Sequence, residues 1–210
     1  MRPAIILCLL LCVLFGMCPR VNAERGFSIE GGLLYDKPLG GTQKPYHDIQ
    51  GGFGYIANFA YDFFEWGGLE FGVMHTSHEF ELAVVNNAVN QGNASKTTLF
   101  LKARACPLRI GKSELIVGLG AGLFEISGTT IVDNFEVSDD FSGLGFLTSL
   151  DYRYKISPGL ELSAHLGMNF VNYNRYEING YKSDYPGSMP DGKSLCWGIT
   201  VFHRIGIPQI

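Results

Sequence analysis

The segment "HTSHEFE", residues 75–81, holds the side chains best suited to covalent chemistry. His75 and Ser77 are two positions apart, so an extended backbone places both on the same side. A histidine activates a serine as a nucleophile when a carboxylate orients the histidine, and Glu79 or Glu81 would supply that carboxylate. The end of an ordinary strand accounts for the same alternation. We favour that interpretation and predict that the protein is not an enzyme.

A second group consists of charged side chains at alternate positions of segments that are otherwise apolar or rich in glycine. Buried charges need partners, because removing an ion from water is costly. We therefore predict a static network of ion pairs in a confined interior, with a gated narrow pore as the alternative. We expect His165 to make hydrogen bonds there rather than to bind a metal ion. The predicted network comprises Glu30, Glu70, Lys102, Arg104, Glu114, Asp151, Arg153, Glu161, His165 and Arg204.

No further pattern points to a cofactor. The sequence lacks a glycine-rich phosphate loop between a strand and a helix, and it lacks the Cys/His spacing of a zinc site. The acidic segment "DNFEVSDD", residues 133–140, does not have the spacing of a calcium-binding loop. We therefore predict no cofactor and no metal site.

The elements that position these side chains are predicted to be strands. In "LIVGLGAGLFEI", residues 115–126, large apolar residues take the odd positions and glycines take most of the even ones. A period of two predicts a strand. Similar segments recur along the chain. They predict eight strands, at residues 26–36, 49–63, 68–77, 97–106, 114–126, 143–156, 160–172 and 194–205.

The predicted connections alternate in length. Short turns follow the second, fourth and sixth strands, whereas long polar stretches follow the others. The long stretches are residues 37–48, 78–96, 127–142 and 173–193. Strict alternation with an even number of strands is typical of outer-membrane barrels.

The two faces of the predicted strands differ in charge. One face is apolar and has no charge at its mid-strand positions, and the other carries the charged residues. A soluble barrel has the opposite arrangement, with an apolar interior. In lipid, a closed barrel satisfies every backbone group. We predict an all-β, eight-stranded antiparallel up-and-down transmembrane β-barrel whose glycines leave room for the charges inside. A lipocalin-like or streptavidin-like soluble barrel is the alternative.

The N-terminal segment matches a secretory signal peptide. It has a basic start, an apolar run that ends near Met17, and small residues at Val21 and Ala23. We predict a cleaved signal peptide at residues 1–23 and a single barrel domain at residues 24–210. Cleavage removes two of the 16 basic residues and none of the 20 acidic ones, so the net charge falls from −4 to −6. This balance argues against a nucleic-acid partner.

The chain resembles the OmpA/OmpX-like small outer-membrane barrels over essentially its whole predicted mature length. The segments "GGFGYIANFAYDFF", "LIVGLGAGLFEI" and "LDYRYKISPGLELSAHLGMNF" carry the resemblance. It implies a monomer in the outer membrane of a Gram-negative bacterium, in contact with lipid and lipopolysaccharide. It also implies insertion by the barrel assembly machinery, and a role in membrane integrity or in surface contact with an extracellular ligand. One departure is the C-terminus, "VFHRIGIPQI", which lacks the usual final aromatic residue.

Three further predictions concern the His75–Ser77 pair, the segment at residues 173–192 and the two cysteines. The His75–Ser77 pair is similar to the arrangement in outer-membrane lipid A deacylases, which keeps a lipid A-modifying enzyme as a minor alternative. The tyrosine-rich segment at residues 173–192 is expected to be a solvated loop suited to adhesion. Cys106 and Cys196 are expected at opposite rims, too far apart for the ~7 Å that a disulfide allows.

Overall fold

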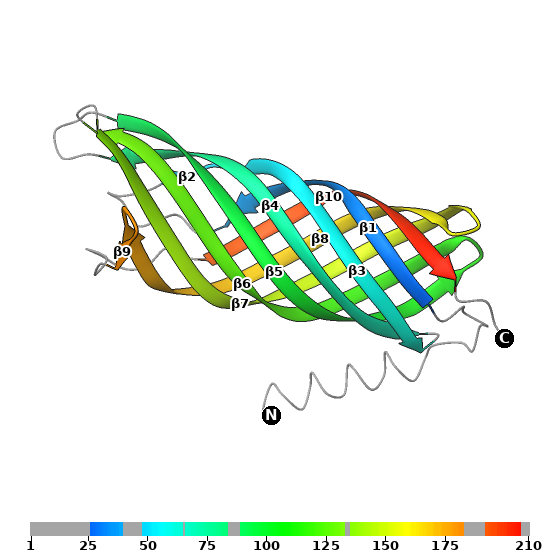
Figure 1. Ribbon diagram of the computed structural model, residues 1–210. Helices are drawn as coiled ribbons and strands as arrows, with labels where there is room; N and C mark the ends of the chain where they lie inside the picture. Colours follow the sequence, from blue (N-terminus) through cyan, green and yellow to red (C-terminus); the bar gives the residue numbers. More distant parts are fainter. Residues whose placement is uncertain are drawn as a thin grey trace, which may run out of the picture.

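The structure, a computed structural model, describes residues 26–39, 48–64, 66–83, 89–132, 135–182 and 192–206. Its long strands are β1 (Gly26–Pro38), β3 (Gly52–Phe64), β4 (Gly67–Ala83), β5 (Val89–Ile110), β6 (Ser113–Val132), β7 (Phe135–Ser157), β8 (Leu160–Ile178) and β10 (Gly192–Gly206). Each pairs antiparallel with the next, and β10 pairs with both β8 and β1, so the eight strands close into a barrel (Figure 1). The predicted fold class is confirmed.

The two ends of the barrel differ. At the turn end, short connections join β3 to β4, β5 to β6 and β7 to β8, as predicted. At the opposite, loop end, the short strands β2 (Asp48–Ile49) and β9 (Tyr181–Lys182) pair with β4 and β8. The hairpins β4–β5 and β6–β7 extend the barrel wall at this end (Figure 1). The predicted signal peptide lies outside the described residues.

Two predicted loops are largely strands. Pairing between β4 and β5 continues to Ala83 and Val89, and pairing between β6 and β7 continues to Val132 and Phe135. Most of residues 78–96 and 127–142 therefore belong to hairpins. Polar residues are frequent in both segments and obscure the alternation that reveals a strand, so these strands were predicted to end too early.

The register of the strands fixes the width of the barrel. The stagger is found by following each residue to its paired residue on the next strand, once around the barrel. Starting at Ile29 on β1, this path passes through Phe59 on β3 and Phe170 on β8 and reaches Lys193 on β10. Lys193 O accepts a hydrogen bond from Leu39 N, so the path returns to β1 ten residues beyond its start. Eight strands with a stagger of this size enclose an interior that side chains fill.

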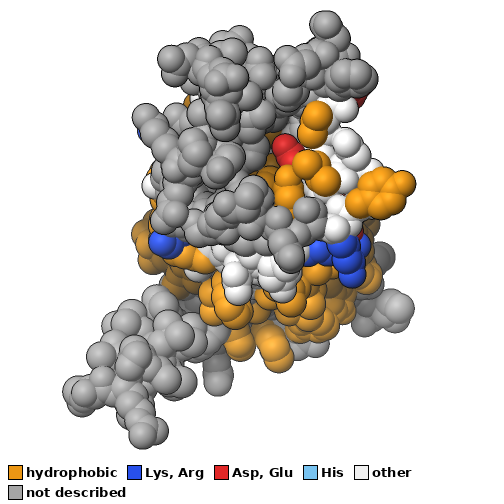
Figure 2. Space-filling view, turned by 90° about the vertical axis from the view of Figure 1, so that its left-hand side faces the viewer, with side chains coloured by type: hydrophobic (Ala, Val, Ile, Leu, Met, Phe, Trp, Pro, Cys, Tyr) orange, Lys and Arg blue, Asp and Glu red, His pale blue; other side chains and the backbone are white. Residues whose placement is uncertain are grey.

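The outward positions are mostly apolar. Figure 2, which views the molecule from the loop end, shows hydrophobic side chains on the lower part of the wall. Leu33 is 74% exposed, Phe53 75% and Phe146 67%, although all three are large hydrophobic residues. Aromatic rings cluster near the loop end, where Tyr35 lies 4.8 Å from the rings of both Phe53 and Trp197. A second cluster lies near the turn end, where the rings of Phe64 and Trp66 stack 5.0 Å apart and Phe27 contacts Tyr61 at 4.6 Å. Two aromatic girdles around an apolar band are typical of membrane barrels.

Glycines make room for the large interior side chains. A Cβ at Gly118 would lie 2.5 Å from both Lys102 Cδ and Ser149 Oγ. A Cβ at Gly72 would lie 2.1 Å from Asn58 Oδ1 and would also collide with the Phe100 ring. The predicted reason for alternating glycine is thus visible in the packing. In the described part of the chain, no helix has the length and apolar character needed to cross a membrane.

Candidate functional site

The interior charges meet in the half of the lumen nearer the turn end, which we call the turn half. Glu70 is 1% exposed, and its Oε1 accepts hydrogen bonds from Lys102 Nζ and Asn58 Nδ2, both at 2.9 Å. Its Oε2 lies 3.8 Å from Arg104 Nη1. Arg104 also donates to both oxygens of Asp62, at 3.1 and 2.8 Å. Strands β3, β4 and β5 therefore share one charge network.

Glu30 connects this network to the other side of the barrel. Its carboxylate accepts hydrogen bonds from Asn58 Nδ2 at 3.3 Å, from Arg153 Nη2 at 3.4 Å and from the Thr200 hydroxyl. The Arg153 guanidinium also lies 3.9 Å from the centre of the Phe202 ring, a cation–π contact. One carboxylate thus links β1, β3, β7 and β10.

His165 belongs to the same half of the lumen. Its Nδ1 lies 2.6 Å from Asp151 Oδ1, and its Nε2 lies 3.9 Å from Cys196 Sγ. Ser149 donates a hydrogen bond of 3.2 Å to the same aspartate. Among the described residues, no three His, Cys, Asp or Glu side chains are arranged to hold a metal ion. Cys196 therefore packs inside the lumen rather than at the outer rim, and it is not joined to Cys106.

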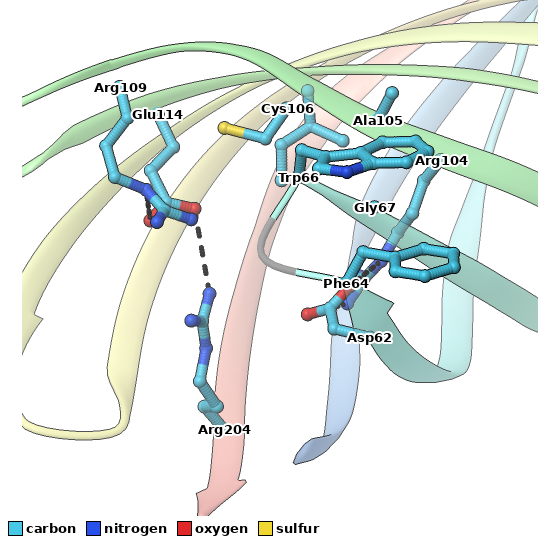
Figure 3. Close-up of a pocket in the computed structure, with 11 residues that line it drawn as sticks. Asp62, Phe64, Trp66, Gly67, Arg104, Ala105, Cys106, Arg109, Glu114 and Arg204 are labelled. Atoms are coloured by element: carbon cyan, nitrogen blue, oxygen red, sulfur yellow. Dashed lines mark hydrogen bonds and ion pairs between the residues drawn. The ribbon is translucent and has the colours of Figure 1, made fainter. Parts of the chain in front are cut away.

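The remaining predicted charges, Glu114, Glu161 and Arg204, lie at the mouth of the turn end, and Figure 3 shows Glu114 and Arg204 there beside Arg109. Arg109 Nε is 2.8 Å from Glu114, and Arg204 bridges Glu114 at 3.6 Å and Glu161 at 3.3 Å. Arg109, Glu114 and Arg204 border a recess with a cavity volume of about 20 Å³. This volume holds a water molecule but not a solute. All ten residues of the predicted network thus face the interior or its mouth.

Several buried polar atoms of the described turn half have no hydrogen-bond partner. These atoms are Asn58 Oδ1, Glu70 Oε2, Arg104 Nη1, Arg153 Nε, Arg153 Nη1, Glu161 Oε2 and Ser163 Oγ. Buried polar atoms of native proteins are satisfied by protein or by ordered water. We therefore expect water inside the turn half.

The half nearer the loop end, the loop half, has an apolar core instead. The lumen was predicted to be polar and filled by side chains, and it is filled, but this part of it is largely apolar. These inward residues alternate with outward apolar residues. Both faces of the strand are therefore apolar, and the sequence shows no alternation between polar and apolar positions. The buried core comprises Leu34, Ile56, Met74, Ala94, Phe100, Phe124, Ile126, Phe141, Leu147, Tyr173 and Tyr176.

Two of these core residues come from the segment at residues 173–192, which was predicted to be a solvated loop. Tyr173 is 4% and Tyr176 is 7% exposed, and the Tyr176 hydroxyl donates a hydrogen bond of 2.5 Å to Asp139. The expectation that this part of the segment is an exposed loop is therefore wrong. Its strand character was hidden by the polar residues around the tyrosines. Tyr181, on β9, is 77% exposed.

One polar cluster in the loop half was missed. Lys96 Nζ lies 2.9 Å from Asp36 Oδ2 and donates a hydrogen bond of 2.7 Å to Ser194 Oγ. His78 Nε2 is 3.6 Å from the same Asp36 oxygen. Asp36 is an even number of positions from Glu30 on the same strand, so it lies on the same inward face. This spacing was enough to predict its place in the lumen. Lys96 fell just outside a predicted strand.

The predicted nucleophile pair lies on the outer surface of β4. Ser77 and Glu79 are exposed, and His75 is half-buried. His75 Nδ1 lies 3.0 Å from Thr97 Oγ1 on β5, and its ring lies 5.4 Å from that of Tyr55. Within the described residues, the histidine makes no hydrogen bond to Ser77 or Glu79. The Glu81 side chain lies outside the described residues.

Comparison with known proteins places this geometry among solved barrels. No protein-family model and no curated protein sequence matches the chain. The outer membrane protein OprG from Pseudomonas aeruginosa is similar, with a TM-score of 0.64 at 12% identity over 88% of this chain and 98% of that one. A major outer membrane protein from Thermus thermophilus has a TM-score of 0.61 at 16% identity, over 85% and 99%.

A third similar structure is Ail, the attachment invasion locus protein of Yersinia pestis, solved with the heparin analogue sucrose octasulfate. Its TM-score is 0.55 at 16% identity, over 87% of this chain and 99% of that one. Identities this low establish the fold alone. The chain therefore has the fold of the small eight-stranded outer-membrane β-barrels, the class that its sequence resembles.

Proposed function

We propose that this protein is an integral barrel of a Gram-negative outer membrane that acts in membrane integrity or surface contact. The main observation behind this proposal is that the outer and inner faces of the barrel wall carry different kinds of side chain. Large apolar side chains cover the outer wall between two aromatic girdles, and buried ion pairs occupy the interior. Lipid outside and a polar lumen inside account for both faces.

The filled lumen supports a role other than transport. Leu34, Ile56, Phe100 and Leu147 pack together in the loop half, and each is 4% exposed or less. A narrow pore is the second candidate, and the unpartnered polar atoms of the turn half favour it. That polar region ends at the apolar core, so we favour the closed barrel.

The loop end is the proposed contact surface. The hairpins β4–β5 and β6–β7 carry polar residues at this end, where lipopolysaccharide and an extracellular ligand would meet the protein. Ail, one of the similar barrels, was solved with a heparin analogue, which makes surface contact a reasonable role for this fold. We further propose a monomer that is inserted by the barrel assembly machinery and has no nucleic-acid partner.

Electrophoresis tests the membrane assignment. The purified protein is run in detergent with and without boiling. A closed barrel resists detergent unfolding, so the two samples should migrate differently. Identical migration, combined with solubility in the absence of detergent, would refute the assignment.

Lipid A analysis tests the proposal that the protein is not an enzyme. Lipid A from cells with and without expression is compared by mass spectrometry. We expect the same acyl-chain composition in both, since His75 hydrogen-bonds to Thr97. Loss of an acyl chain that depends on Ser77 would overturn the proposal in favour of a deacylase.

A further inference from the structure

Cys196, His165 and Asp151 form a chain of polar contacts inside the lumen. Asp151 Oδ1 accepts a hydrogen bond of 2.6 Å from His165 Nδ1, so the other ring nitrogen, Nε2, faces Cys196 Sγ at 3.9 Å. All three side chains are buried, and Cys196 is 2% exposed. A thiol beside a base that a carboxylate orients is the arrangement that activates a nucleophile, and such contacts are often long before a substrate binds.

Gly167 makes the contact between sulfur and ring possible. It pairs with Cys196 across β8 and β10, and a Cβ there would lie 2.7 Å from Cys196 Sγ and 3.0 Å from His165 Nε2. A side chain at this position would therefore displace the sulfur or the ring. On the other side of Cys196, the paired residue is Asp36, whose charge Lys96 Nζ balances at 2.9 Å. Asp36 is thus already paired with a cation, whereas His165 Nε2 faces the sulfur.

A line of inward polar side chains leads from the turn end to this cluster. Glu161, Ser163 and His165 are successive inward residues of β8, and Glu161 lies at the mouth. Glu161 Oε2 and Ser163 Oγ are buried and have no hydrogen-bond partner among the described residues. Ordered water satisfies buried polar atoms of this kind. We therefore expect water along this line, and a polar molecule little larger than water can follow it to Cys196.

We propose that Cys196 is a reactive thiol that hydrogen peroxide oxidises to a sulfenic acid. His165 takes the thiol proton while the sulfur attacks one peroxide oxygen. The O–O bond breaks, and the leaving hydroxide takes that proton from His165 and departs as water. The sulfur is oxidised and the peroxide is reduced. Hydrogen peroxide fits the path because it is small, uncharged and forms hydrogen bonds as water does. This reactivity goes beyond the proposed surface role and does not depend on it.

Oxidation of the wild-type protein tests the site without any substitution. Protein folded in detergent and protein denatured in urea are treated with hydrogen peroxide at neutral pH, and catalase then destroys the peroxide. Dimedone, added under denaturing conditions, labels the sulfenic acid, and peptide mass spectrometry measures the label at Cys196. We expect oxidation to be roughly ten-fold faster in the folded protein, because a free thiol is mostly protonated at neutral pH. Burial alone predicts equal or slower oxidation on folding, and that result would overturn the proposal.

Two substitutions test whether His165 is the base. His165→Asn should slow the oxidation of Cys196 by about 100-fold, the lower end of what a positioned general base contributes. Gly167→Ala should also slow it, because the new Cβ displaces the sulfur or the ring. His78→Asn is the matched control: His78 is another buried histidine of the lumen, but its Nδ1 contacts the backbone oxygen of Gln50. This variant should react like the wild type.

The gel shift on boiling first verifies that each variant folds. Bulky cumene hydroperoxide should oxidise Cys196 more slowly in the folded than in the denatured wild type, which separates a narrow path from an open one. Wild-type rates in folded His165→Asn, or equal slowing by His165→Asn and His78→Asn, would overturn the proposal. If His165→Asn does not fold, Gly167→Ala and the comparison of folded with denatured wild type still decide the result.

Discussion

The two halves of the lumen are filled by different kinds of side chain. In the turn half, the fully buried Glu70 and Arg153 are held by ion pairs and hydrogen bonds that cross the barrel. In the loop half, Phe100, Phe124 and Leu147 pack as an ordinary hydrophobic core. Side chains fill both halves. Among the described residues, most buried polar atoms without a hydrogen-bond partner lie in the turn half, and Asp36 Oδ1 is one in the loop half.

This difference shows how one barrel can have strands that are tied together and a lumen that is closed to ions. The directional contacts of the turn half tie β1, β3, β4, β5, β7 and β10 to one another. The apolar core offers no partner to an ion, because moving a charge into an apolar region costs several kcal/mol. The turn half therefore fixes the strands, and the loop half blocks the path through them.

The largest expected effect comes from breaking the turn-half network. Glu70→Ala should destabilise the barrel by about 3–5 kcal/mol, because Lys102 and Arg104 lose a buried counter-charge. Urea unfolding in lipid vesicles, followed by the gel shift, measures this change. Glu79→Ala is the control, since Glu79 is exposed on the same strand and should change stability by less than about 0.5 kcal/mol. Equal effects of the two substitutions would contradict a network inside the lumen.

A cavity in the loop half should cost somewhat less. Leu147 is 4% exposed within the apolar core, so Leu147→Ala is expected to cost about 2–5 kcal/mol. The same unfolding assay applies. Leu33→Ala removes the same side chain from the lipid-facing wall, where Leu33 is 74% exposed and leaves no internal cavity. If Leu33→Ala were the more damaging change, the assignment of inward and outward faces would be reversed.

A charge introduced on the outer wall of the barrel tests whether that wall contacts lipid. Leu119→Arg should cost about 2–4 kcal/mol, because Leu119 faces lipid far from either rim. Ile110→Arg, at the turn end, should cost only about 0–1 kcal/mol because the charge reaches the interface. Unfolding in vesicles compares the two. Similar costs at both positions would argue against a bilayer around the barrel.

The two cysteines report on water at the mouth of the turn end and deeper in the lumen, with the smallest expected effect. Cys106 lines the recess at the turn end, whereas Cys196 is 2% exposed beside His165. A water-soluble thiol reagent should therefore label Cys106 several-fold faster in the folded protein. Labelling is followed by mass spectrometry, and denatured, unreduced protein should show both thiols. Faster labelling of Cys196 would mean that water enters from the loop end.

The sequence predicted the barrel because lipid and lumen impose opposite demands on alternate residues. Wherever both demands act, as between Leu115 and Leu123, the period of two was clear and the strand was placed correctly. Beyond the apolar band this contrast disappears, and the outer parts of β4 to β8 were taken for loops. The charged residues were found by their parity alone.

The apolar core of the loop half could not be found in the same way. An inward Phe100 between outward Leu99 and Leu101 looks like a run of apolar residues, not like two faces. Only the register shows that it meets residues from other strands.

Conductance in planar lipid bilayers tests the central claim, that the apolar half of the lumen closes the barrel, most directly. The wild-type protein, inserted after its boiling-dependent gel shift has been verified, should give no steady single-channel current steps in salt solution. A general porin inserted under the same conditions serves as the positive control. Regular steps that grow in proportion to salt concentration would contradict the account, because they would require a continuous aqueous path past Phe100 and Leu147.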